Sequence, residues 1–203
     1  MTRINALTLE QKLPMALSSL PWKRQLAFSL LVLERLLPSP IAFSKDTHLD
    51  VSSYLAARDY VWTALGGIPD LSRGRSLNDA CLRDAPDTEK FSHDLTSFAL
   101  DAALAVSDIL EFIADGRLDH TLSVSTHATD SVYLFVSGPG SSSSLPPGRA
   151  VEIEKHPLVQ GELRRQEEDF KFLSGLPDAF NSETISLLRA RASAQPPLLT
   201  LLR

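Results

Sequence analysis

Cysteine and a surplus of basic charge are what this sequence lacks most clearly. Among its 203 residues Cys81 is the single cysteine, so no disulfide can form within the chain, and a reducing compartment is expected. Lysine and arginine number 20 against 25 aspartate and glutamate residues, which gives a formal net charge of -5. Because neutralising phosphates requires a surplus of basic side chains, this balance argues against nucleic-acid binding. It suits solubility, or a basic protein partner.

The sequence also lacks an uninterrupted apolar run of membrane-spanning length. The run 26–37 is shorter than the roughly 20 apolar residues that a bilayer requires, and it contains Glu34 and Arg35. Pro14 and Pro21 interrupt the early apolar stretch, and no cationic start closely precedes it. We therefore expect no signal peptide. Together these absences predict a cytoplasmic protein that has no membrane partner.

The spacing of apolar residues predicts an all-α fold. A chain of this length is long enough for one sizeable core and short for two. Helical spacing is present over residues 21–37, 50–65, 157–173 and 177–191. Residues 94–115 are apolar almost all round, which is typical of a helix buried in the middle of a bundle. We therefore expect a single-domain bundle of about six to eight helices around this central helix.

Two segments depart from this regular pattern. Residues 68–90 are rich in Asp, Gly, Pro and Arg, which predicts a long connection with room for a short helix at 77–83. Residues 118–136 favour a strand by their serine, threonine and valine content. The apolar residues of the same segment are also spaced like one face of a helix. Local composition alone leans towards the strand.

The domain organisation follows from where the helical pattern stops. We expect one helical domain over residues 20–192, preceded at 1–19 by an N-terminal extension or first helix and followed at 193–203 by a tail. The segment 137–149 is a Gly/Ser/Pro-rich stretch. Too little chain follows it to build a second core, so it is expected to be a flexible loop within the domain.

An aspartate recurs every seven residues along the apolar helix. Seven residues are nearly two helical turns, so these side chains form one stripe that drifts by ~20° per heptad. The stripe is open to three interpretations: a solvated edge, internal ion pairs with arginines such as Arg35 or Arg58, or an acidic docking ridge for a cationic partner. The candidate partner-binding residues are therefore Asp94, Asp101, Asp108, Glu111 and Asp115.

The sequence contains no convincing catalytic, metal or cofactor site. Two carboxylates one heptad apart lie ~10 Å apart along the helix axis, too far for a tightly coupled dyad. The five histidines show neither the His-x-x-x-His nor the Glu-x-x-His spacing of metal sites. Cys81 has no positioned base beside it. For an enzyme, the one residue set to test is Asp101, Asp108 and His120.

Short motifs between Leu20 and Leu173 follow one another in a recognisable order. They are Trp22 with Leu33-Glu34-Arg35, Asp59-Tyr60-Val61-Trp62, Asp101-Ala102 with Ala105-Val106-Ser107-Asp108, His120 with Val124-Ser125, and His156-Pro157-x-Val159 with Glu162 and Gln166. This order resembles the YjaG-like family of bacterial all-helical proteins, a domain of unknown function. Thr63 stands where that family usually has a glutamate, as in a divergent member. The resemblance implies that residues 118–136 are helical, and it supplies no catalytic residues.

These observations favour a non-catalytic protein-binding module. Its most concrete form is an immunity protein, which binds a cognate bacterial toxin and occludes its active surface. The modest size and the acidic balance suit that role, since a typical nuclease toxin is basic and opposite charges speed association. The alternative is a housekeeping YjaG-like protein of unknown role, which could form a homo-oligomer. An uncharacterised enzyme is the third hypothesis, and none of the three requires a cofactor.

Overall fold

Helices account for all the regular secondary structure in the described part of the chain. A computed structural model describes residues 6–138, 147–177 and 180–198, and within these residues the chain forms ten α-helices and no strand. The helices are α1 (Ala6–Ser18), α2 (Trp22–Leu36), α3 (Pro38–Thr47), α4 (Ser52–Gly66), α5 (Leu71–Arg83), α6 (Thr96–Asp115), α7 (Leu118–Ser137), α8 (Pro147–Glu154), α9 (Pro157–Ser174) and α10 (Ser182–Ala194). The predicted all-α, single-domain bundle is confirmed.

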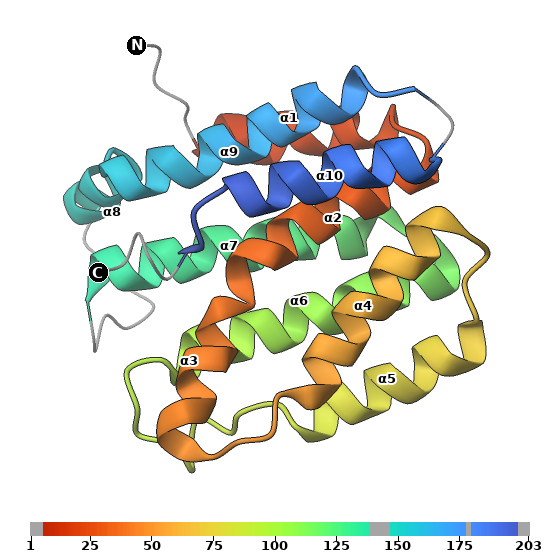
Figure 1. Cartoon of the computed structure of the whole chain (residues 1–203). Helices are drawn as coiled ribbons and strands as arrows, with labels where there is room; N and C mark the ends of the chain where they lie inside the picture. The colour runs from red at the N-terminus through yellow and green to blue at the C-terminus, as the bar shows by residue number, and fades with distance from the viewer. Residues whose placement is uncertain (1–5, 139–146, 178–179, 199–203) are drawn as a thin grey trace.

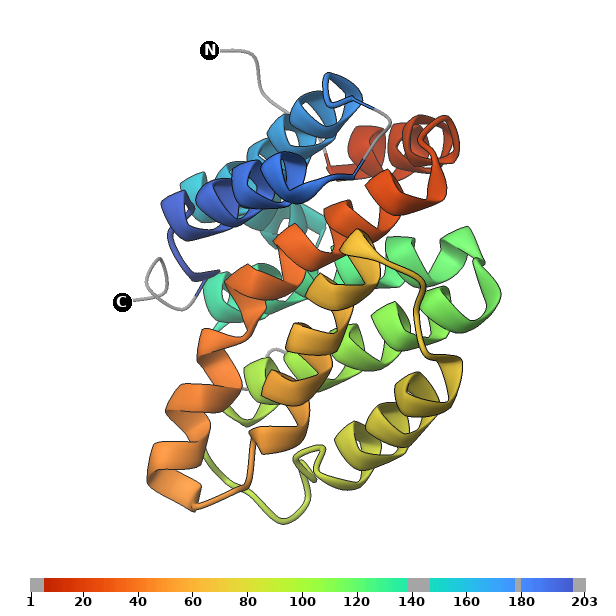
Figure 2. The same cartoon turned by 45° about the vertical axis from the view of Figure 1, so that its right-hand side comes forward.

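Helix α2 crosses the middle of the bundle and separates two groups of helices. Helices α1, α9 and α10 lie on one side of it, while α4, α5 and α6 lie on the other (Figures 1 and 2). The long helices α6 and α7 are joined by a tight turn at Gly116, whose left-handed φ of 72° suits glycine. They run antiparallel, which places the whole length of α6 beside α7.

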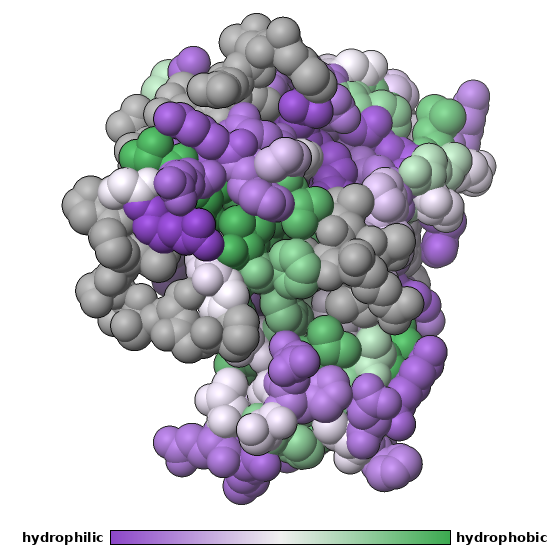
Figure 3. All heavy atoms as spheres, turned by 90° about the vertical axis from the view of Figure 1, so that its left-hand side faces the viewer, coloured by the Kyte–Doolittle hydropathy of each residue, from purple (hydrophilic) through white to green (hydrophobic). Residues whose placement is uncertain are grey.

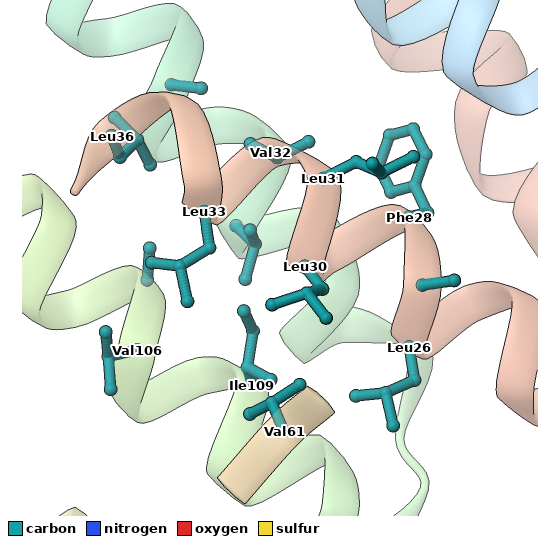
Figure 4. Close-up of a cluster of buried hydrophobic side chains, with 14 of the residues drawn as sticks. Leu26, Phe28, Leu30, Leu31, Val32, Leu33, Leu36, Val61, Val106 and Ile109 are labelled. Carbon is teal, nitrogen blue, oxygen red and sulfur yellow. The ribbon is translucent and has the colours of Figure 1, made fainter. Parts of the chain in front are cut away.

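The centre of the core is shared by α2 and α6. Every residue from Leu26 to Leu33 is buried, because α2 contacts α6 and α7 as well as α4, α9 and α10. Leu33 of α2 points towards Val106 of α6, and Val61 of α4 closes the same cluster (Figure 4). Each such aliphatic side chain stabilises the fold by roughly 1.5–3 kcal/mol when fully buried. The prediction that α6 is a central apolar helix is confirmed, and α2 is a second one.

The apolar stretch Trp22–Thr47, which spans α2 and α3, contributes to the core of the bundle. By length and composition this stretch could cross a membrane, but 78% of its apolar window is buried inside the protein. A buried core helix of a soluble protein has the same composition, so the stretch is weak evidence for a span.

Helix α5 corrects the prediction for residues 68–90. The helix begins at Leu71, six residues before the short helix that was expected at 77–83. Its start is fixed by Asp70, whose side chain accepts hydrogen bonds from the backbone N–H groups of Ser72 and Arg73. Gly74 weakens the sequence signal for a helix, but it allows close packing here, since a Cβ atom would lie 3.0 Å from the Tyr60 hydroxyl. Packing against α4 therefore outweighs the low helix propensity of glycine.

Helix α7 confirms that residues 118–136 are helical, as the family resemblance implied. Its buried face includes Val124, Ala128 and Val132, which follow one another at helical spacing. Hydroxyl side chains that favour strands by composition bond instead to the preceding turn, as Thr129 does to the carbonyl of Ser125 at 3.1 Å. A buried helical face thus overrides local composition.

The segments expected to be irregular are shorter than predicted. Helix α7 continues to Ser137 and α8 begins at Pro147, so both ends of the predicted loop 137–149 are helical. The remaining residues 139–146 lie outside the described residues. In the predicted tail, α10 extends to Ala194 and Leu198 is fully buried. Residues 199–203 also lie outside the described residues.

Candidate functional site

The acidic stripe of α6 lies along two histidines of α7. Asp108 is placed between them, with its Oδ1 3.4 Å from Nδ1 of His120 and its Oδ2 3.0 Å from Nε2 of His127. His120 also extends to Asp115, 3.2 Å from its Nε2. Because the two histidines are themselves one heptad apart, their spacing on α7 matches the aspartate spacing on α6. We call these four residues the Asp/His seam.

Asp101 lies one heptad before the Asp/His seam, in a more buried setting. Its Oδ2 accepts a hydrogen bond of 2.6 Å from the Ser131 hydroxyl of α7. Burial raises the pKa of the Asp101 carboxyl above its ordinary value, although the Ser131 hydrogen bond and the nearby His127 act in the opposite direction. The negative charge of Asp130 adds a further increase.

The remaining residues of the stripe and its two ends differ in their surroundings. Glu111 accepts a hydrogen bond of 2.6 Å from the Asn78 amide of α5. Asp94 is exposed just before α6, and Asp115 is exposed at its end. The stripe is therefore divided between helix–helix contacts in the middle and solvent at the ends. Neither Arg35 nor Arg58 forms an ion pair with any described residue of it.

Arg35 instead forms a buried ion-pair cluster with α9. Its side chain is 1% exposed and lies 2.8 Å from Glu162 and 2.7 Å from Asp169, both of which are fully buried. Burial opposes the charge of Arg35, but the two carboxylates outweigh it and raise its pKa. Such a cluster needs every partner, since a buried charge that loses its counter-ion is strongly destabilising.

The same cluster anchors α10 against the rest of the bundle. Asp169 accepts hydrogen bonds from Arg191 at 2.7 Å and from Gln195 at 2.6 Å. Gln195 in turn accepts one from Arg35 at 2.5 Å. Asp169 and Arg35 together therefore fix the position and rotation of α10.

A polar cleft opens where α10 passes over α2 and α4. It has a volume of about 300 Å³. On its wall the Trp62 indole N–H donates to Glu34 Oε1 at 2.7 Å, and the Arg189 guanidinium lies 4.4 Å from the centre of the Trp62 ring. We call this cavity the α10 cleft; it is lined by Glu34, Arg58, Trp62, Arg189, Ala192 and Ser193.

Sequence reasoning did not predict the α10 cleft. Glu34 and Trp62 belong to motifs that carry the family resemblance, which is the only signal that pointed to them. Nothing in the sequence around Arg189 marks it as a site residue. In the folded structure it is exposed on α10 and lies over the Trp62 ring.

The described residues offer little to a metal or to nucleophilic chemistry. Within them, no group of three or more His, Cys, Asp or Glu side chains is arranged to hold a metal ion. Cys81 is fully buried, and burial raises its pKa to about 11, which makes it a poor nucleophile at neutral pH. Of the set proposed for an enzyme, Asp108 and His120 are adjacent, whereas Asp101 bonds to Ser131. None of the three lines the α10 cleft.

The fold and the buried charge cluster together define a class of protein: a small helical bundle whose helices are held together by buried polar contacts as well as by apolar packing. A family model described as "Protein of unknown function (DUF416)" matches residues 12–196, and the chain belongs to this family. Its fold is similar to the crystal structure of a DUF416 family protein from Shewanella baltica OS155, at 16% identity and a TM-score of 0.79. That similarity covers 91% of this chain and 96% of the other. No curated protein matches the chain.

Proposed function

We propose that this DUF416 protein is a non-catalytic protein-binding module that docks its partner at one end of the bundle. The observation that carries the proposal is the exposure of Ile68, whose side chain is 98% exposed in the short connection between α4 and α5. A second apolar side chain, that of Leu71 at the start of α5, is 41% exposed. An apolar side chain gains roughly 1.5–3 kcal/mol on full burial, so a partner that covers Ile68 gains affinity from it.

The connection that carries Ile68 lies beside the turn between α6 and α7. The Asn78–Glu111 hydrogen bond of 2.6 Å aligns α5 with α6, and the two helices run in opposite directions. The start of α5 therefore lies next to the end of α6, at the right of Figure 1, and Figure 2 shows the same arrangement. We call this region the docking end and define it by Ile68, Asp70, Leu71, Asp115 and Asp119.

Charged side chains lie at the docking end beside the apolar residues. Three aspartates, Asp70, Asp115 and Asp119, are exposed there against two exposed arginines, Arg73 and Arg117, and Arg117 forms an ion pair with Asp119 at 2.5 Å. An apolar centre with a charged rim is the usual composition of a protein interface. An acidic rim favours a basic partner and increases its rate of association.

The most concrete form of this proposal is an immunity protein that binds and neutralises a cognate bacterial toxin. The net charge of -5 and the acidic rim support a basic toxin as the partner. A cytoplasmic location belongs to the same proposal, and the single, buried Cys81 is consistent with a reducing compartment.

Co-expression with the product of the adjacent gene tests the proposal. We expect the wild-type chain to restore growth of cells that carry this product and to co-purify with it. Ile68→Asp should abolish both effects, because it places a charge at the centre of the interface. Val151→Asp is the matched control: Val151 is 45% exposed on α8, at the opposite end of the bundle, where apolar atoms also reach the surface (Figure 3). An adjacent product that neither harms the cells nor forms a complex would contradict the immunity role.

The alternative is a housekeeping role in the YjaG-like group, exerted by a homo-oligomer. One observation favours self-association: Arg75 and Asp79 are exposed on α5 without any ion pair among the described residues, between the exposed Leu71 and Leu82. Two α5 helices that pair antiparallel about a twofold axis would place each arginine near the aspartate of the other copy. Sedimentation of the wild type and of Arg75→Asp tests this role. If α5 forms the dimer, the wild type should sediment as a dimer and Arg75→Asp as a monomer.

A further inference from the structure

The α10 cleft brings together charges of both signs. Arg58 contributes a guanidinium whose side chain is 31% exposed, and the exposed Arg189 contributes a second. Glu34, which is half-buried and lines the same cleft, contributes a carboxylate. The lining carries two positive charges and one negative charge, and Asp59 is paired with Arg58 beside it. Groups of both signs are therefore available in the cleft, which suits a ligand that also carries both.

The polar groups that line the cleft have capacity left for a ligand. Arg58 uses Nε and Nη2 on Asp59, at 3.0 and 2.8 Å, so its Nη1 group is not engaged. Arg189 contacts the Trp62 ring and forms no ion pair with a described residue. Glu34 accepts the Trp62 N–H through Oε1, while its Oε2 has no hydrogen bond within the described structure. Two donors and one acceptor are thus available at once.

The frame of the cleft is held by packing and by an ion pair. Trp62 is 4% exposed and provides a packed wall. Helix α10 is held by the fully buried Leu188 and by the Arg191–Asp169 contact of 2.7 Å, two residues beyond Arg189. Because these anchors fix the rotation of α10, the Arg189 guanidinium is held over Trp62. A site held in place before binding loses less entropy when a ligand arrives.

We infer that the α10 cleft binds a small α-amino acid. Its carboxylate accepts hydrogen bonds from Arg58 and Arg189, since guanidinium groups match a carboxylate in geometry and charge. Its ammonium group donates to Oε2 of Glu34. A volume of about 300 Å³ lies at the lower end of the range for small-molecule sites, so a small amino acid fits within it. This site is separate from the docking end and does not depend on the proposed protein partner.

Amide NMR titrations with three matched probes test the inference. L-alanine carries both charges, propionate carries only the carboxylate, and ethylamine carries only the amine. The reporter is the indole N–H resonance of Trp62, and that of Trp22 is the internal control, since the chain has 2 tryptophans. We expect L-alanine to shift the Trp62 resonance in a saturable way. Propionate should bind with a Kd at least ~10-fold higher, and ethylamine should cause no shift.

Two variants then assign the contacts. Glu34→Gln retains an acceptor for Trp62 but removes the charge, so it should weaken L-alanine at least ~10-fold. It should not weaken propionate, because it also removes a negative charge that repels the propionate carboxylate. Arg189→Gln should weaken both probes, whereas Arg83→Gln, an exposed arginine on α5 without an ion pair in the described structure, should change neither. Equal affinity for L-alanine and propionate, or for inorganic phosphate, would make the cleft a general anion site and overturn the inference. Absence of a Trp62 shift with L-alanine would also overturn it.

Discussion

The carboxylate of Asp108 on α6 lies 3.0 Å from Nε2 of His127 on α7. This contact, together with that to His120, joins the two longest helices along their shared face. Aspartates and histidines at the same seven-residue period meet because the helices are antiparallel and in contact throughout. The middle of the acidic stripe therefore contributes to the association of α6 with α7.

Asp108→Asn should lower the free energy of unfolding by about 1–2 kcal/mol, since it weakens two charge-assisted hydrogen bonds. Asp94→Asn is the matched control at the exposed end of the stripe and should change stability by less than about 0.5 kcal/mol. Urea denaturation followed by far-UV circular dichroism measures both. Equal, negligible losses would mean that the Asp/His seam contributes no stability.

Asp101→Asn should make the protein more stable at pH 7. Burial raises the pKa of Asp101 in the folded chain, so folding favours its protonated form. Protonated Asp101 contributes fully to the free energy of unfolding below its ordinary pKa of 3.8. This contribution is lost as the pH rises through the raised pKa of the folded chain. Asparagine keeps an acceptor for Ser131 without the charge. The melting temperature of the variant should therefore exceed that of the wild type at pH 7, and the difference should narrow towards pH 4. A difference that does not change with pH would show that ionisation of Asp101 does not destabilise the wild type.

Arg35→Ala should lower the free energy of unfolding by about 3–5 kcal/mol, because it removes the one fully buried cation that both carboxylates share. Glu162 would then keep only Arg165 and Asp169 only Arg191, and both of these arginines are more exposed than Arg35. Arg149→Ala removes an exposed ion pair, formed with Glu152 at 3.2 Å, and should lower it by less than about 1 kcal/mol. Calorimetry of the two variants provides the comparison. Similar losses in both would show that the buried cluster does not stabilise the fold.

Cys81 should resist labelling in the folded protein. Burial raises its pKa to about 11, so almost no thiolate is present at neutral pH, and the fully buried side chain is closed to reagents. A thiol-reactive dye at pH 7 should label the native chain very slowly and the urea-unfolded chain rapidly. Fast labelling without denaturant would contradict this burial.

Much of the fold could be predicted from the sequence because apolar spacing and caps act locally. The apolar residues of α6 indicate a buried helix without knowledge of its neighbours. Helix α5 was partly missed, because Gly74 weakens the local pattern and its compensation, close packing against Tyr60 of α4, is a tertiary contact. For residues 118–136, local composition favoured the wrong structure until the family resemblance was considered.

The pairing of charged residues could not be predicted in the same way. The seven-residue period of the aspartates was visible, but the antiparallel docking that brings His127 to Asp108 was not. One of the three interpretations of the aspartate stripe paired it with Arg35, but Arg35 pairs instead with Glu162 and Asp169, more than a hundred residues away along the chain. Arg189 likewise contacts Trp62, which is more than a hundred residues away along the chain. Such contacts depend on the packing of helices that are distant in sequence.

The dissociation constant between this protein and the product of its adjacent gene tests the proposed function most directly. Calorimetric titration should give a tight complex for the wild type and for Val151→Asp. For Ile68→Asp the Kd should increase by at least ~100-fold, as for the loss of an interface hot spot. Rising salt should also weaken the wild-type complex, because the acidic rim contributes to association. If Ile68→Asp binds as tightly as the wild type, the docking end is not the binding surface, and the protein does not have the proposed function.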